Sequence, residues 1–84
     1  MSKWKLVYKS DGEMPVFIEL WRHVRQGTSY WCVRMFFGGK GAGKGKFIVT
    51  TGRALYKEFH DLKDFNDFLV KQRLPPITEG ESDG

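Results

Sequence analysis

The chain has 84 residues, of which 40% are hydrophobic and 15% aromatic, so it is long enough for one domain with one hydrophobic core. It contains no run of about 20 apolar residues that could cross a bilayer, and no apolar stretch of a secretory signal follows its first residues, so we expect a cytoplasmic protein. One cysteine excludes an internal disulfide, and two histidines 37 positions apart do not have metal-ligand spacing. We expect neither a metal nor another cofactor.

The formal net charge of +4 is divided unevenly along the chain. Residues 1–57 contain eleven Lys and Arg against three carboxylates, a net charge of +8, whereas residues 58–84 have a net charge of −4. Positive charge concentrated in one part of a fold is typical of polyanion-binding proteins, although random clustering on a soluble surface gives the same count. The charge therefore favours a phosphate-rich partner only if the basic side chains converge in space.

The two-residue alternation of apolar side chains predicts several strands, separated by turn residues. Gly, Asp, Ser and Gln occupy the turns at residues 10–13 and 26–29, and residues 38–45 form a basic, glycine-rich loop. The second and third strands should therefore form a hairpin. The predicted strands cover residues 3–9, 16–25, 30–37, 47–51 and 54–59.

A helix is predicted to follow the strands. Asp61 can cap it, and Leu62, Phe65, Phe68 and Leu69 recur at helical spacing. The helix should end near residue 73, because prolines at 75 and 76 oppose helical backbone. These elements predict an α+β domain over residues 1–77, in which an antiparallel sheet of four to five strands packs on one C-terminal helix. Residues 78–84 carry acids and no large apolar side chain, which predicts a disordered acidic tail.

Alternation also assigns the two faces of the predicted sheet. We expect the core face to hold Val16, Ile18, Leu20 and Val24 from the second strand and Trp31, Val33, Met35 and Phe37 from the third. The opposite, open face would then combine aromatic rings, which stack on unpaired bases, with cations, which neutralise phosphates. With the lysines of the glycine-rich loop, the predicted nucleic-acid-binding residues are Phe17, Trp21, His23, Arg25, Tyr30, Arg34, Phe36, Lys40, Lys44 and Lys46.

Two alternatives to nucleic-acid binding stay open at this point. The aromatic side chains could simply be packed, since Trp and Phe are far more often buried than exposed. They could also dock on another protein, which would make the chain a small interaction or inhibitor domain, possibly of phage type, or a homodimer. Single-stranded DNA or RNA is the favoured partner because a solvent-facing sheet is normally polar, and this one is not.

No catalytic constellation is evident in the sequence, so we expect a protein that is not an enzyme. Residues 38–44 match the first seven positions of the phosphate-binding loop G-x-x-x-x-G-K, but Gly45 stands where a magnesium-binding Ser or Thr is required. A strand rather than a helix is predicted to follow the loop. Cys32 lies in a predicted strand without a basic partner other than Arg34, which is typical of a packing residue.

The sequence resembles the WGR module, a small DNA-binding domain of sheet and helix. The resemblance lies in residues 30–41 (YWCVRMFFGGKG), residues 56–62 (YKEFHDL), and Phe65 and Phe68 on the predicted helix. Gly38 matches the glycine of the family's Trp-Gly-Arg triplet, while Phe37 and Gly39 replace its Trp and Arg. The order of strands followed by a helix is equally similar to whirly and related single-stranded-DNA-binding folds. Both resemblances imply nucleic-acid binding.

Overall fold

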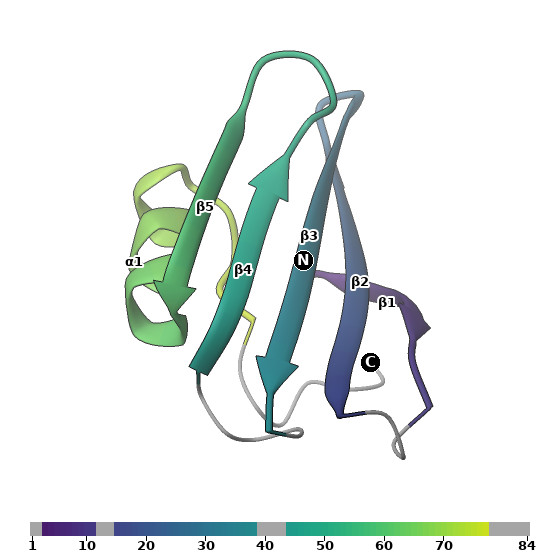
Figure 1. The fold of residues 1–84 in the computed structure, drawn as a ribbon. Coiled ribbons are helices and arrows are strands. Elements are labelled where there is room, and N and C mark those ends of the chain that lie inside the picture. Colours follow the sequence, from purple (N-terminus) through teal and green to yellow (C-terminus); the bar gives the residue numbers. More distant parts are fainter. Residues whose placement is uncertain (1–2, 12–14, 39–43, 78–84) are drawn as a thin grey trace.

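A computed structural model describes residues 3–11, 15–38 and 44–77 of the chain. This part of the chain forms a five-stranded antiparallel sheet and one helix near the C-terminal end (Figure 1), which confirms the predicted α+β class. Within those residues no helix is long and apolar enough to cross a membrane. The elements are β1 (Lys5–Lys9), β2 (Val16–Arg25), β3 (Thr28–Phe37), β4 (Lys44–Thr50), β5 (Tyr56–Asp61) and α1 (Leu62–Lys71).

The strands form a meander, with each strand hydrogen-bonded to its neighbours in the chain in the order β1-β2-β3-β4-β5. The predicted hairpin of β2 and β3 is confirmed. Its two-residue turn consists of Gln26 and Gly27, whose φ angles of 52° and 79° match the twist of the flanking strands. This turn pairs Arg25 with Thr28 and so determines every cross-strand pair farther down the hairpin.

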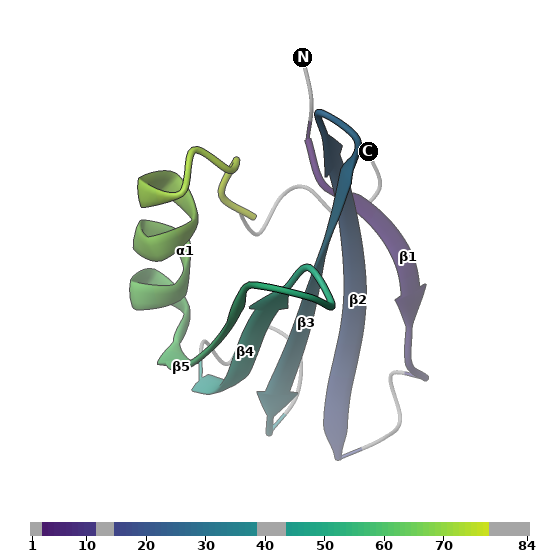
Figure 2. The same ribbon diagram turned by 90° about the horizontal axis from the view of Figure 1, so that it is seen from above.

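Helix α1 and the segment after it lie on the same side of the sheet (Figure 2). As predicted, the Asp61 carboxylate caps the helix, accepting a hydrogen bond from the backbone N–H of Lys63 at 2.8 Å. The segment then returns toward the sheet, where Leu74 and Ile77 are buried. Asn66 holds this segment in place, because its side chain donates to the Ile77 carbonyl (3.0 Å) and accepts from the Ile77 N–H (3.1 Å).

The face of the sheet that α1 covers is the opposite of the predicted one. Its buried side chains are Phe17, Trp21, Cys32, Phe36, Phe47 and Val49, which pack against Phe65 and Leu69 of the helix. The core assignment of Val16, Ile18, Leu20, Val24, Trp31, Val33, Met35 and Phe37 was therefore wrong. Both sets alternate equally well, so periodicity alone does not choose between them, and the bulkier aromatic set has the larger apolar area to bury.

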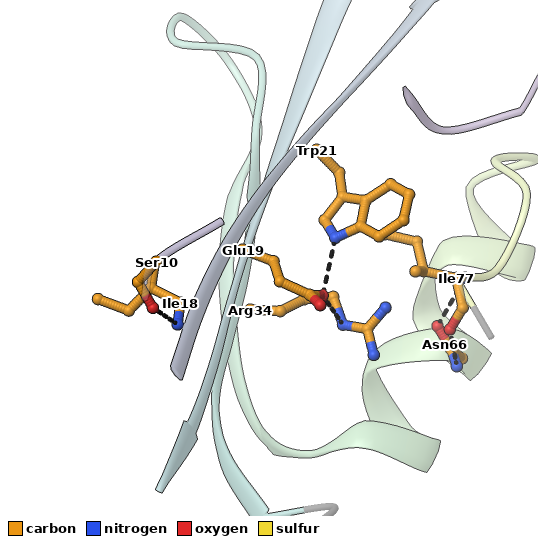
Figure 3. Close-up of polar contacts among 7 residues, drawn as sticks. All are labelled: Ser10, Ile18, Glu19, Trp21, Arg34, Asn66 and Ile77. Atoms are coloured by element: carbon orange, nitrogen blue, oxygen red, sulfur yellow. Dashed lines mark hydrogen bonds and ion pairs between the residues drawn. The ribbon is translucent and has the colours of Figure 1, made fainter. Parts of the chain in front are cut away.

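Charged side chains on the covered face are buried because they meet each other. Glu19 and Arg34 are register partners, with Glu19 Oε1 3.6 Å from Arg34 Nε. The Trp21 indole donates a hydrogen bond to the same Glu19 oxygen at 3.0 Å, and these three side chains point into the layer between sheet and helix (Figure 3). The Arg34 guanidinium also lies 5.0 Å from the ring centre of Phe36. Paired in this way, a carboxylate and a guanidinium can occupy an apolar interior.

An irregularity in β1 turns one of its aromatic side chains outward. Trp4 and Leu6 face the core, and the Trp4 indole donates to the Pro75 carbonyl. The register then shifts between Leu6 and Tyr8, where one extra residue is accommodated. Tyr8 consequently pairs with Leu20 on the other side of the sheet and is 57% exposed, whereas uninterrupted alternation would put it on the same side as Trp4 and Leu6.

The central position of Trp21 gives the first testable prediction. Because its side chain is only 1% exposed, we expect Trp21→Ala to lower the free energy of unfolding by about 3–5 kcal/mol. Val70→Ala, which truncates an apolar side chain on the exposed surface of α1, should cost less than about 1 kcal/mol. Urea unfolding of both variants measures the difference, and equal small losses would contradict the burial of Trp21.

Candidate functional site

Seven of the predicted binding residues lie on the covered face, and five of them are buried there, where they cannot contact a strand of nucleic acid. Phe17, Trp21, His23, Arg34 and Phe36 are buried there. Arg25 and Tyr30 are half-buried at the end of the same face, where the Arg25 guanidinium lies 5.2 Å from the Tyr30 ring centre. The prediction that these residues form an open face was therefore wrong, because that face packs on α1 and the segment that follows it.

The predicted lysines of the glycine-rich loop have separate positions. Lys40 lies outside the described residues, and Lys44 is described only as the first backbone position of β4. Lys46 is the member of this group that reaches the uncovered side of the sheet. There it forms an ion pair with Glu58 of β5, with a distance of 3.2 Å between Nζ and Oε2.

The side of the sheet opposite α1, here called the outer face, is largely apolar. No element of the described chain covers it (Figure 2). Phe37 is 50% exposed and Tyr56 is 66% exposed. A sheet face that meets water is normally polar, and a contiguous apolar patch with a polar rim usually marks an interaction surface. The half-buried centre of the outer face consists of Val16, Ile18, Leu20, Val33, Met35 and Ile48.

One line of residues across the outer face combines cations with aromatic rings. Successive register pairs place Lys5, Arg22, Trp31, Thr50 and Tyr56 side by side, one from each strand. We call this line the cation–aromatic row. The Arg22 guanidinium lies 5.4 Å from the ring centre of Trp31, and its Nη2 donates to the Ser29 hydroxyl at 3.2 Å. The row therefore presents an oriented guanidinium beside the largest ring of the face.

A hollow of about 260 Å³ lies at the β1 end of this row. It is lined by Lys3, Lys5, Arg22, His23 and Val24, and we call it the cationic hollow. Lys5 and Arg22 are direct register partners, an arrangement that is destabilising for like charges. None of the three cations forms an ion pair within the described part of the chain. An anion placed between them would relieve this repulsion.

Sequence reasoning assigned Trp31 to the core and gave Arg22 and Lys5 no role. A signal for the correct face was nevertheless present in the turn. A two-residue hairpin at Gln26 and Gly27 places Glu19 directly opposite Arg34, so the charges on the aromatic side of the hairpin can neutralise each other. Arg22, on the other side, has Trp31 opposite it and no carboxylate. The face with the self-paired charges is the one that can be buried.

Neither a cluster of metal ligands nor a reactive cysteine is found among the described residues. Among them, no three His, Cys, Asp or Glu side chains are grouped as metal ligands would be. Cys32 is fully buried in the core on the covered face, and this burial raises the pKa of its thiol, an effect that the charge of Arg34 opposes only in part. A thiol held protonated in the core is a poor nucleophile.

We compared the chain with models of known protein families, with curated proteins and with solved structures, and found no match in any of the three. The resemblance to WGR and whirly-type modules stays a prediction.

Burial of Cys32 gives a prediction about alkaline stability. An unfolded chain loses the thiol proton above its ordinary pKa of 9.0, whereas the folded chain keeps it. The free energy of unfolding should therefore fall with rising pH above about 9, by up to about 1.4 kcal/mol per pH unit more than in Cys32→Ala. Urea unfolding of both proteins between about pH 8 and 10.5 tests this, and parallel pH profiles would contradict a protonated, buried thiol.

Proposed function

We propose that this protein is a non-enzymatic module that binds single-stranded nucleic acid on its outer face. The observation that carries the proposal is the cation–aromatic row, in which Arg22 lies over Trp31 and the cationic hollow adjoins both. Aromatic rings stack on bases of any sequence, and basic side chains neutralise phosphates. A purely apolar partner would pack on the rings but would supply no negative charge for the cations of the row and the hollow.

The spacing of the row suits unpaired bases. Neighbouring strands are about 4.8 Å apart, so Trp31 on β3 and Tyr56 on β5 are separated by about 10 Å, with the small Thr50 between them. One strand of nucleic acid lying across the sheet could stack bases on the two rings while its phosphates lie toward Lys3, Lys5 and Arg22. A duplex cannot bind in this way, because its base faces are already stacked on one another.

The distribution of charge supports the same orientation. The cap and α1, on the covered side of the sheet, carry three carboxylates (Asp61, Asp64 and Asp67) against two lysines (Lys63 and Lys71), so this segment is close to neutral. The cations of the row and hollow lie on the outer face. A polyanion is therefore attracted to the outer face more strongly than to the helix, which orients its approach.

A second candidate function is suggested by the aliphatic side chains of the outer face. Ile18, Leu20, Val33, Met35 and Ile48 form a centre without a charged member, and at its border Lys46 is neutralised by Glu58. Such a surface can pack on the sheet of another protein or of a second copy at a distance of about 10 Å. Self-association and strand binding would compete for the same face, which makes them separable by experiment.

Stacking on Trp31 is tested by a pair of matched substitutions. Trp31→Leu keeps an apolar side chain but removes the ring, and we expect it to weaken binding of a labelled single-stranded oligonucleotide by about 1–3 kcal/mol without changing the salt dependence. Trp31→Tyr restores a ring and should recover most of the affinity. Fluorescence anisotropy measures both, and equal affinities for the leucine and tyrosine variants would contradict stacking.

Phosphate contacts at the cationic hollow are tested through salt dependence. For a single strand, each contact contributes about −0.7 to the slope of log affinity against log salt concentration. Lys3→Gln and Lys5→Gln should each reduce the slope by about that amount, whereas Lys71→Gln, which removes the same charge from α1, should leave it unchanged. Identical slopes in all three variants would show that the hollow does not contact the strand.

The same samples distinguish the two candidate functions. Sedimentation of the free protein reports self-association, and binding to single- and double-stranded oligonucleotides reports the nucleic-acid partner. A protein that forms dimers and binds no oligonucleotide at low salt would overturn the proposal in favour of the second candidate. Preference for the duplex would also overturn it, because stacking on Trp31 requires unpaired bases.

A further inference from the structure

A second, larger pocket lies at one end of the molecule and is separate from the cationic hollow. Its volume is about 530 Å³, within the range of pockets that hold small ligands. Three parts of the chain meet around it, namely the turn between β2 and β3, the loop between β4 and β5, and the C-terminal end of α1. We call it the end pocket.

The lining of the end pocket has an apolar part and a cationic part. Tyr30, Ala54 and Leu55 supply apolar surface, and Tyr30 and Leu55 are anchored by packing against the core. Two arginines, Arg25 and Arg53, line the same pocket, and no carboxylate does. A ligand with a flat apolar portion and an anionic group matches this lining. Further hydrogen-bonding groups come from Thr28, Ser29, Thr51 and Gln72.

Arg25 is held in position before any ligand arrives. Its Nη1 donates to the backbone carbonyls of Gln72 (3.1 Å) and Arg73 (2.7 Å), and its Nη2 donates to the Tyr30 hydroxyl (3.0 Å). These contacts engage three of the five N–H donors of a guanidinium. Arg25 thereby fastens the end of α1 to the β2–β3 hairpin and retains donors for an anion.

The loop on the other side of the pocket is also ordered by its own hydrogen bonds. The Thr51 hydroxyl accepts from the backbone N–H groups of Arg53 (3.2 Å), Ala54 (3.0 Å) and Leu55 (3.4 Å). The backbone N–H of Thr51 in turn donates to the Leu55 carbonyl at 3.1 Å. A preformed pocket avoids part of the entropic cost of ordering its walls on binding.

Ser29 connects the end pocket to the outer face. It lines the pocket, and its hydroxyl accepts from Arg22, the residue whose guanidinium lies over Trp31. We propose that the end pocket binds one nucleotide, with the base against Tyr30 and Leu55 and the phosphate beside Arg53 and Arg25. The inference rests on the proposed function, since the nucleotide is one unstacked from a strand that lies along the cation–aromatic row.

The test uses the intact chain with nucleoside 5′-monophosphates, the corresponding nucleosides and inorganic phosphate as separate probes. Amide chemical shifts of Gly27, Ser29, Ala54 and Leu55 report binding at the pocket. We expect the monophosphate to bind more tightly than the nucleoside or phosphate alone, and Arg53→Gln to weaken it about tenfold through loss of a charge-assisted hydrogen bond. Ala54→Trp should abolish binding by filling the pocket. Lys71→Gln, which removes an exposed cation from the same end of α1 but outside the lining, should have no effect.

Each other outcome overturns the inference in a recognisable way. Phosphate that binds as tightly as the nucleotide would mean that the pocket accepts any anion, and shifts that survive both Arg53→Gln and Ala54→Trp would place the ligand elsewhere. If oligonucleotides bind in a Trp31-dependent manner while monophosphates do not bind, the inference that the end pocket binds a nucleotide is wrong and the proposed function stands. If monophosphates bind and oligonucleotides do not, strand binding fails, and with it the idea that the nucleotide comes from a strand.

Discussion

The paired charges of Glu19 and Arg34 determine which side of this sheet is the interior. An ionised group enters an apolar core only when a partner of opposite charge and further hydrogen bonds compensate for lost hydration. Here the partner is supplied across the β2–β3 ladder and the further hydrogen bond by the Trp21 indole. Phe17, Trp21 and Phe36 of the same hairpin lie on this covered face beside the pair.

Much of the architecture could be predicted from the sequence because it depends on local signals. The boundaries of β2, the Gln26–Gly27 turn and the Asp61 cap each follow from the conformational preferences of a few adjacent residues. The β1 irregularity could not be predicted in this way. An extra residue between Leu6 and Tyr8 changes the face of every residue after it, and no turn or glycine announces it.

The candidate site was not predictable to the same degree, because alternation divides a strand into two sets without saying which set is inside. Treating aromatic rings beside cations as an exposed surface failed for Trp21 and Arg34, since their polar groups bond to Glu19 within the core. The useful criterion is whether the charges on a face can neutralise each other. Glu19 and Arg34 are register partners of opposite charge and can neutralise each other, whereas the register partners Lys5 and Arg22 are both positively charged.

A five-stranded sheet has two faces, and the described chain supplies one short helix to cover them. The ten residues of α1 span about 15 Å, while five strands extend over about 20 Å. Helix α1 and the segment after it are therefore both needed to cover one face of the sheet. A larger domain would add a second layer of helices or a second sheet on the other side. No element of the described chain adds such a layer over Trp31, Val33 and their neighbours, so these side chains would gain energy by packing on a ligand. Under the proposed function, the cations at the margin of that surface would select an anionic ligand, which is why we place the function on the outer face rather than on the more aromatic interior.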